Sequence, residues 1–172
     1  MLFRSAEINR IEGVHETLSG LPALASSDFT PGAAPGEFVS GVRSEDLTRL
    51  TYPDASFDLV LTSETLEHVP DLARGLAEIR RVLSPGGWHI FTVPLLPNVP
   101  KTYARASLQP DGRITRHAAE IRHPGGDVGY PVFTEFGADL PSILASSGFT
   151  ADMRFGPVTD DDLGQVFVTR RS

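Results

Sequence analysis

The side chains of this sequence that could do chemistry are histidines, carboxylates and tyrosines, because the 172 residues include no cysteine. His68 lies shortly after an apolar run, and residues 95–132 contain a polar set, namely Tyr103, Arg105, His117, Arg122, His123, Asp127 and Tyr130. An imidazole with an unperturbed pKa of about 6.5 can take a proton from a nucleophile near neutral pH. This set could therefore bind or deprotonate a polar molecule, although loops often collect such residues without a function. For His68, a packing role is equally compatible with the sequence.

A metal centre is not predicted. Without cysteine there are neither disulfides nor thiolate ligands. The run Asp160, Asp161 and Asp162 could bind a divalent cation, but a solvated turn is the favoured interpretation because no complementary ligands lie near it in the sequence.

The clearest predicted elements form one strand, helix and strand unit. Residues 57–61 form an apolar run typical of a buried strand, and residues 88–93 form a second. Between them, Leu72, Leu76 and Ile79 recur at helical spacing within a predicted helix over residues 70–83, which Ser84-Pro85-Gly86-Gly87 ends. Alternation of this kind indicates an α/β fold with a mostly parallel sheet.

The remaining elements are predicted from weaker patterns, and the whole chain, residues 1–172, is expected to form one domain. Residues 95–132 show no lasting period and are predicted to be an irregular insertion on the substrate side. We expect further strands at residues 2–6, 23–29, within 38–44, 149–155 and 163–169, and helices at residues 10–18 and 136–147.

The run from Glu45 to Val69 resembles the class I S-adenosylmethionine-dependent methyltransferases, in particular the type 11-like domain. It contains Asp54-Ala55-Ser56-Phe57-Asp58-Leu59-Val60 followed by Leu66-Glu67-His68-Val69, which are similar to the family's central strand and the segment after it. Residues 79–87, ending Leu83-Ser84-Pro85-Gly86-Gly87, are similar to the family's turn from helix to strand. The resemblance covers residues 42–94. It implies a Rossmann-like methyltransferase sheet, mostly parallel, with an antiparallel closing pair of strands and helices on both faces.

The resemblance also implies S-adenosylmethionine as cofactor, with S-adenosylhomocysteine as product. By this resemblance Asp46 would accept the adenine amino group, while the backbone amide of Leu47 meets a ring nitrogen. Asp28 would accept the ribose hydroxyls, since a carboxylate offers two acceptor oxygens. The methionine ammonium would meet the residues after the central strand, Thr62, Ser63 and Glu64. Their alternatives are structural: a cap or solvated turn for Asp46, a loop acid for Asp28, and an ordinary strand exit for the other three.

One family feature is missing from the sequence. The glycine-rich turn after the first strand lets the backbone approach the cofactor in this family. Its predicted equivalent here is Ser5-Ala6-Glu7-Ile8-Asn9, which contains no glycine. Glu7 is still expected to face the cofactor's ammonium.

Two hypotheses follow, from different functional classes. The first is methyl transfer to a small-molecule acceptor, with His68 and His123 as candidate catalytic residues; segments near His123 and residues 136–140 hint at a sugar-related acceptor. The second is a degenerate methyltransferase-like domain that acts as a binding or regulatory partner without catalysis. A nicotinamide-dependent oxidoreductase is disfavoured because its glycine fingerprint is absent.

Composition narrows the set of partners. A net charge of −7 and a pI near 5.1 disfavour binding to nucleic acid. The apolar runs are far shorter than the roughly 18 residues that a membrane span needs. With no signal-peptide pattern at the first residues, a cytoplasmic location is expected. An exposed sheet edge would favour a homo-oligomer.

Overall fold

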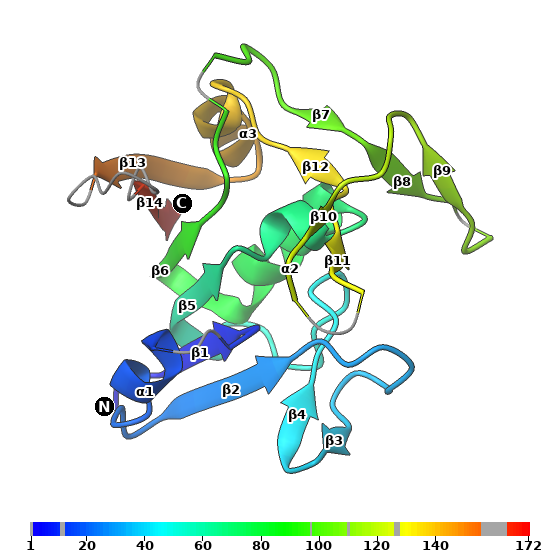
Figure 1. Cartoon of the computed structure of the whole chain (residues 1–172). Coiled ribbons are helices and arrows are strands. Elements are labelled where there is room, and N and C mark those ends of the chain that lie inside the picture. Colours follow the sequence, from blue (N-terminus) through cyan, green and yellow to red (C-terminus); the bar gives the residue numbers. More distant parts are fainter. Residues whose placement is uncertain (1, 11–12, 97, 110, 126–127, 156–164) are drawn as a thin grey trace.

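The computed structural model describes residues 2–10, 13–96, 98–109, 111–125, 128–155 and 165–172, and a sheet of eight strands runs through them (Figure 1). In spatial order the strands are β13 (Phe149–Phe155), β14 (Gln165–Arg171), β6 (Leu83–Thr92), β5 (Phe57–Ser63), β1 (Ser5–Ile8), β2 (Leu24–Asp28), β4 (Val42–Ser44) and β3 (Phe38–Val39). The five strands from β6 to β4 are parallel, while β14 is antiparallel to both of its neighbours. The predicted α/β sheet with an antiparallel closing pair is confirmed.

Two helices cover one face of this sheet. The first, α2 (Leu72–Val82), begins at Asp71, whose side chain accepts a hydrogen bond from the backbone amide of Arg74 at 3.0 Å. Such a cap satisfies one of the amides that a helix start leaves free. The second, α3 (Leu140–Ser146), begins after Asp139 and is shorter than the predicted helix over residues 136–147.

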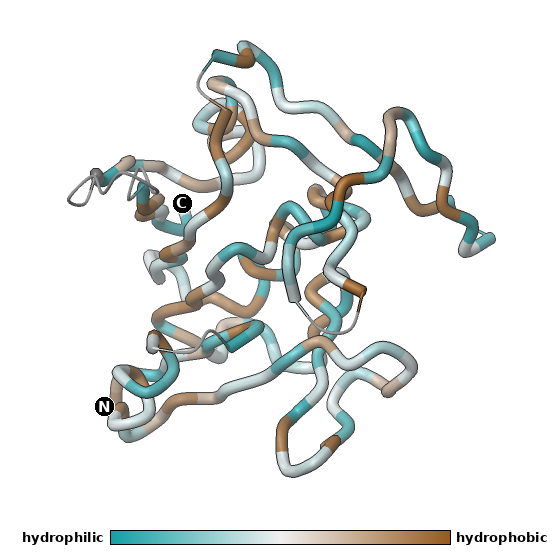
Figure 2. Tube along the Cα trace, in the orientation of Figure 1, coloured by the Kyte–Doolittle hydropathy of each residue, from teal (hydrophilic) through white to brown (hydrophobic). Residues whose placement is uncertain are grey.

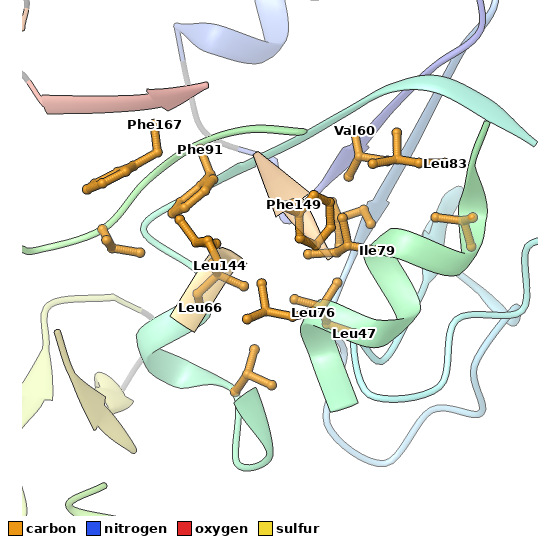
Figure 3. Packing of buried hydrophobic residues seen from close by; sticks show 14 of the residues in the cluster. Leu47, Val60, Leu66, Leu76, Ile79, Leu83, Phe91, Leu144, Phe149 and Phe167 are labelled. Carbon is orange, nitrogen blue, oxygen red and sulfur yellow. The ribbon is translucent and has the colours of Figure 1, made fainter. Parts of the chain in front are cut away.

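The core lies between these helices and the sheet (Figure 3). Side chains at alternate strand positions point toward the helices and are buried, because successive strand residues face opposite sides. Full burial of each such side chain contributes on the order of 2 kcal/mol to folding. The largest contributors include Val60, Phe91, Phe149 and Phe167 from the strands, and Leu76, Ile79 and Leu144 from the helices.

The opposite face of the sheet is thinly covered. Its helix, α1 (Val14–Leu18), has only five residues and none of them is buried. Leu61 and Ile90 on that face are half-buried, and Trp88 is 41% exposed. Figure 2 shows hydrophobic stretches along these central strands, which explains why the sequence pattern predicted them so clearly.

The predicted position of the first strand is wrong. A strand was expected at residues 2–6, but β1 begins only at Ser5, and Leu2 and Phe3 are 62% and 56% exposed. An ion pair at 2.8 Å between Arg4 and Asp58 fixes the start of β1 beside β5. The prediction relied on apolar character alone and therefore placed the start of the strand three residues too early.

The other predicted elements agree with the structure more closely, with two exceptions that lie outside the described residues. The helix expected at residues 10–18 is described only as α1, since residues 11 and 12 are not described. The Asp160–Asp162 turn and residues 163–164 of the last predicted strand also lie outside the described residues. None of the described helices is long and apolar enough to cross a membrane.

The insertion contains more order than its sequence predicted. The insertion extends beyond the predicted residue 132 and forms three two-stranded ladders, which are β7 (Tyr103–Ala104) with β12 (Thr134–Glu135), β8 (Ala106–Leu108) with β9 (Ile114–Arg116), and β10 (Arg122–His123) with β11 (Tyr130–Pro131). Its two ends meet where Leu95 bridges Phe136, and the amide of Leu96 donates to the Phe136 carbonyl at 2.9 Å. In Figure 1 the β8–β9 hairpin projects away from the sheet.

Candidate functional site

The strand order creates a switch point between β1 and β5. From β1 the chain moves outward through β2 to β4, then returns to β5 and moves the other way to β6. Open α/β sheets bind ligands beyond the carboxyl ends of their strands at such a point. The residues predicted to bind the cofactor follow or end these strands, so the structure brings their segments to one edge of the sheet.

A hollow of about 180 Å³ lies at this edge. It is lined from four strands and α1 by Glu7, Asn9, Val14, Leu61, Thr62, Ser63, Ile90, Phe91, Thr92 and Val166. Glu7 is 2% exposed, and one of its carboxylate oxygens lies 2.6 Å from His15 Nδ1. The hollow is smaller than the roughly 300 Å³ at which ordinary ligand pockets begin.

The predicted equivalent of the glycine turn, Ser5 to Asn9, is misplaced. Ser5–Ile8 are β1 itself, so Glu7 lies within the strand and the turn starts only at Asn9. Asn9 has a φ of 60°, a left-handed conformation that side chains other than glycine rarely adopt. The backbone thus makes a tight turn here with asparagine in place of glycine.

Asp28 ends β2 as predicted, but its carboxylate already has partners. The guanidinium of Arg10 contacts it at 2.7 Å and 3.0 Å, and the backbone amide of Arg10 donates to it at 2.8 Å. Both side chains remain about a third exposed. A ribose would have to displace the Arg10 side chain to use both carboxylate oxygens.

Asp46 follows β4 and organises its own turn. It accepts hydrogen bonds from the amide and the hydroxyl of Thr48 at 2.9 Å and 2.7 Å, and from Arg49 at 2.9 Å. Burial alone would raise the pKa of Asp46, but these bonds outweigh it and the pKa lies below its ordinary value. Leu47 is buried beneath it against α2. The adenine role and the turn role are compatible, because the carboxylate is still 24% exposed.

The three residues expected after the central strand lie in different surroundings. Thr62 lines the hollow, but its hydroxyl lies 3.0 Å from His89 Nε2 in the core. The Ser63 hydroxyl lies 2.7 Å from that of Thr92 and lines the hollow. Glu64 is exposed and has a φ of 46°, so backbone strain occurs at the ends of both β5 and β1.

The two candidate histidines, separated by 55 positions in the sequence, meet in the structure. His68 ends the 3-10 helix η1 (Leu66–His68), and His123 lies on β10; their rings make an edge-to-face contact with centroids 5.0 Å apart. Sequence reasoning missed the residue between them. The Glu67 carboxylate lies 3.6 Å from His68 Nε2 and 3.5 Å from His123 Nδ1.

Burial dominates the electrostatics of this cluster. Glu67 is 1% exposed, and burial raises its pKa to about 8, which favours the protonated acid at neutral pH. Burial also lowers the pKa of His68, and the nearby His123 lowers it further despite the hydrogen bond with the Pro131 carbonyl. Uncharged imidazole and carboxylic acid are therefore the forms that burial favours here.

The comparisons with known proteins agree with this architecture. A family profile described as a methyltransferase domain matches residues 25–91, from β2 to β6. The demethylmenaquinone methyltransferase of Deinococcus radiodurans is 52% identical over 42 residues, which are 24% of this chain and 17% of the relative. Residues 25–91 are thus similar to a methyltransferase domain, in agreement with the resemblance of residues 42–94 to the class I S-adenosylmethionine-dependent methyltransferases.

Two solved methyltransferases support the same fold. One from Mesorhizobium loti has a TM-score of 0.60 at 21% identity, covering 98% of this chain and 90% of that one. An amino pentose methyltransferase from Micromonospora echinaspora, involved in calicheamicin biosynthesis and solved with bound S-adenosylmethionine, has a TM-score of 0.59 at 16% identity, covering 99% and 84%. The sequence match to the Deinococcus relative spans less than a fifth of that protein's length.

The other polar residues that were singled out in the insertion mostly hold the insertion together. Arg105 is 9% exposed; it contacts Glu135 at 2.6 Å and donates to the Ala119 carbonyl at 2.6 Å. His117 lies 2.9 Å from the Ser107 hydroxyl. Tyr130 remains beside His68, with ring centroids 5.8 Å apart. Asp127 lies outside the described residues.

Proposed function

We propose that this domain transfers a methyl group from S-adenosylmethionine to a small-molecule acceptor. The observation that carries the proposal is the switch point between β1 and β5, around which the cofactor candidates gather within a methyltransferase sheet. The family match over residues 25–91 covers two of these segments, the ends of β2 and β4, as well as the end of β5. The acceptor then belongs on the insertion side, where His68 and His123 meet.

On the cofactor side, each carboxylate has a distinct proposed task. Asp46 accepts the adenine amino group while the Leu47 amide donates to the ring. Asp28 binds the ribose hydroxyls after the Arg10 side chain moves aside. Glu7 supplies negative charge near the methionine ammonium at the hollow, where Ser63 and the backbone of Thr62 and Glu64 complete the strand end. S-adenosylhomocysteine is the product.

Methyl transfer requires alignment more than acid or base groups. The acceptor's nucleophilic atom attacks the methyl carbon in line with the departing sulfur, so holding the two molecules in place supplies most of the acceleration. A base is needed only where the nucleophile must lose a proton. His68 and His123 are placed to hold a polar acceptor; the amino pentose methyltransferase among the structural neighbours supports a sugar-related one.

A second candidate function is supported by a specific observation. The ion pair between Arg10 and Asp28, together with the small hollow, leaves the cofactor edge partly closed. A chain that stayed closed would serve as a binding or regulatory partner without catalysis. The thinly covered sheet face around Trp88 would then favour self-association, which sedimentation at several protein concentrations tests.

Calorimetric titration with S-adenosylmethionine and S-adenosylhomocysteine separates these two functions. We expect micromolar binding that Asp46→Asn and Asp28→Asn each weaken at least tenfold, or about 1.4 kcal/mol. Asp111→Asn is the matched control, because Asp111 is an exposed carboxylate of the insertion, paired only with the exposed Arg113. A folded wild-type protein that binds neither compound would refute the enzymatic proposal and leave the partner function.

A further inference from the structure

Glu67, His68 and His123 place three ligand atoms in one small volume. One carboxylate oxygen and two ring nitrogens all lie within 4.8 Å of one another, the only such group of three or more among the described residues. Two of these side chains are neighbours in η1 and the third comes from β10, more than 50 positions later. The fold of the insertion therefore assembles this cluster.

The spacing of the three atoms does not fit hydrogen bonding. Glu67 Oε1 lies 3.6 Å from His68 Nε2 and 3.5 Å from His123 Nδ1, whereas hydrogen bonds to nitrogen are about 2.7 to 3.2 Å long. Bonds of about 2.0 Å to one tetrahedral ion separate its ligand atoms by roughly 3.3 Å. The measured distances are close to this spacing.

The Glu67 carboxylate is left without partners. Both of its oxygens are buried, and neither has a hydrogen-bond partner among the residues that the structure describes. Burying a carboxylate is costly unless it is paired or coordinates a cation. Of the carboxylates considered above as site residues, Glu67 alone has both oxygens in this state.

His68 is oriented as metal-binding histidines are. Its Nδ1 lies 2.8 Å from the Pro131 carbonyl, which can only accept, so Nδ1 carries the proton and Nε2 offers a lone pair toward Glu67. A backbone carbonyl in this position fixes the ring and raises its basicity as a ligand. The side chain of His123 is 33% exposed, which gives an ion access from solvent.

We propose that Glu67, His68 and His123 bind one divalent first-row transition-metal ion, with Zn²⁺ as the best fit. Two imidazole nitrogens and one carboxylate oxygen suit zinc, cobalt, nickel or ferrous iron, whereas magnesium and calcium prefer oxygen ligands throughout. Three protein ligands leave a fourth position for an exchangeable group. This site lies apart from the cofactor edge and shares His68 and His123 with the proposed acceptor side, but binding of the ion can be measured without methyl transfer.

The test uses tag-free full chain, stripped with a chelator and titrated with Zn²⁺ by calorimetry and with Co²⁺ by visible absorption. We expect one equivalent of either metal to bind, with Co²⁺ giving the strong bands of a low-coordinate site. His123→Ala and Glu67→Gln should each weaken Zn²⁺ binding at least tenfold and abolish those bands. His117→Ala is the matched control, because His117 lies in the same insertion outside the cluster.

Either of two results would overturn the proposal: no stoichiometric binding by folded wild-type protein, or equal Zn²⁺ affinity in wild type and His123→Ala. His123→Ala carries the test if Glu67→Gln does not fold, since the partly exposed His123 is the safer side chain to truncate. All titrations omit S-adenosylmethionine, so a failure here is distinct from a failure of the proposed methyl transfer.

Discussion

Asp28 and Asp46 at the cofactor edge differ from Glu67 beneath the insertion in the hydrogen bonding of their carboxylates. At the cofactor edge, Asp28 is paired with Arg10, and Asp46 accepts three hydrogen bonds within its own turn. Beneath the insertion, Glu67 is more deeply buried than either, and neither of its carboxylate oxygens has a hydrogen-bond partner within the described part of the chain. Asp28 and Asp46 are thus hydrogen-bonded without a ligand, whereas both oxygens of Glu67, and one oxygen of Glu7 at the cofactor edge, have no hydrogen-bond partner among the described residues.

This difference in hydrogen bonding affects how a ligand binds at each of the two regions. A ligand at the cofactor edge must exchange existing bonds for new ones, so its net gain is small for each contact. A cation at Glu67 displaces only the proton that burial favours, and it removes the cost of an unpaired buried group. Burial and satisfied hydrogen bonding must therefore be considered together when a carboxylate is assigned a function.

The largest expected effect comes from removing the support of the insertion. Arg105→Ala leaves the Glu135 carboxylate and the Ala119 carbonyl without their donor, which we expect to lower the free energy of unfolding by about 3 kcal/mol. His123 should lose its fixed position in the same variant, so Zn²⁺ binding should fall while S-adenosylmethionine binding persists. Urea denaturation and calorimetry measure the two effects.

Arg113→Ala is the control for this variant. Arg113 is 83% exposed and pairs only with Asp111, so its loss should change the free energy of unfolding by less than about 0.5 kcal/mol. Equal destabilisation by both variants would contradict the structural role of Arg105.

An intermediate effect concerns His89, a buried titratable group of the sheet. This side chain is fully buried, and burial lowers its pKa to about 3, against about 6.5 in the unfolded chain. Since the unfolded state binds the proton first, the free energy of unfolding is at its full value above pH 6.5. It falls by about 1.4 kcal/mol per pH unit as the pH drops toward 3.

His89→Phe should remove this pH dependence. The flat phenyl ring would keep the stacking on Phe91 but would leave the Thr62 hydroxyl without its partner, so the overall stability also changes. For that reason the slope between pH 6.5 and pH 4 is compared, from urea denaturation at several pH values. Identical slopes in wild type and variant would show that His89 is not the responsible group.

The smallest expected effect is a gain of affinity at the cofactor edge. Arg10→Ala frees Asp28 from an ion pair that is a third exposed and worth at most about 1 kcal/mol. S-adenosylmethionine should then bind up to about fivefold more tightly. A tenfold loss in calorimetry would instead make Arg10 part of the cofactor site, and the contrast between the two regions would disappear.

The elements that were predicted best are those with a strong local pattern. The helix expected at residues 70–83 is α2, because its apolar stripe and its Asp71 cap agree, but the turn predicted at residues 84–87 is wrong, since β6 already begins at Leu83. The first strand was placed too early because Leu2 and Phe3 are apolar yet exposed. The hairpins of the insertion were not predicted, since contacts such as those of Arg105 join residues that are far apart in the sequence.

The residues of the candidate site, too, were predicted best where the local sequence pattern is strong. Asp46 was found because the family motif over residues 42–94 is continuous in the sequence, and Asp28 because it ends the predicted second strand. His68 and His123 were singled out separately, but only the tertiary fold brings them together. Glu67 was missed because a glutamate is usually exposed, and no sequence signal indicates that Phe133 lies against it and donates its backbone amide to the Glu67 carbonyl.

The bridge between Leu95 and Phe136 has a consequence for how this fold can change. The chain enters the insertion at Leu95 and leaves it at Phe136, where the two segments touch. The insertion between them is therefore a loop with fixed ends. A segment of another length or sequence could be grafted there at little entropic cost, since closure entropy grows only slowly with loop length. The insertion can thus be exchanged, in evolution or by protein engineering, while the sheet beneath it stays the same.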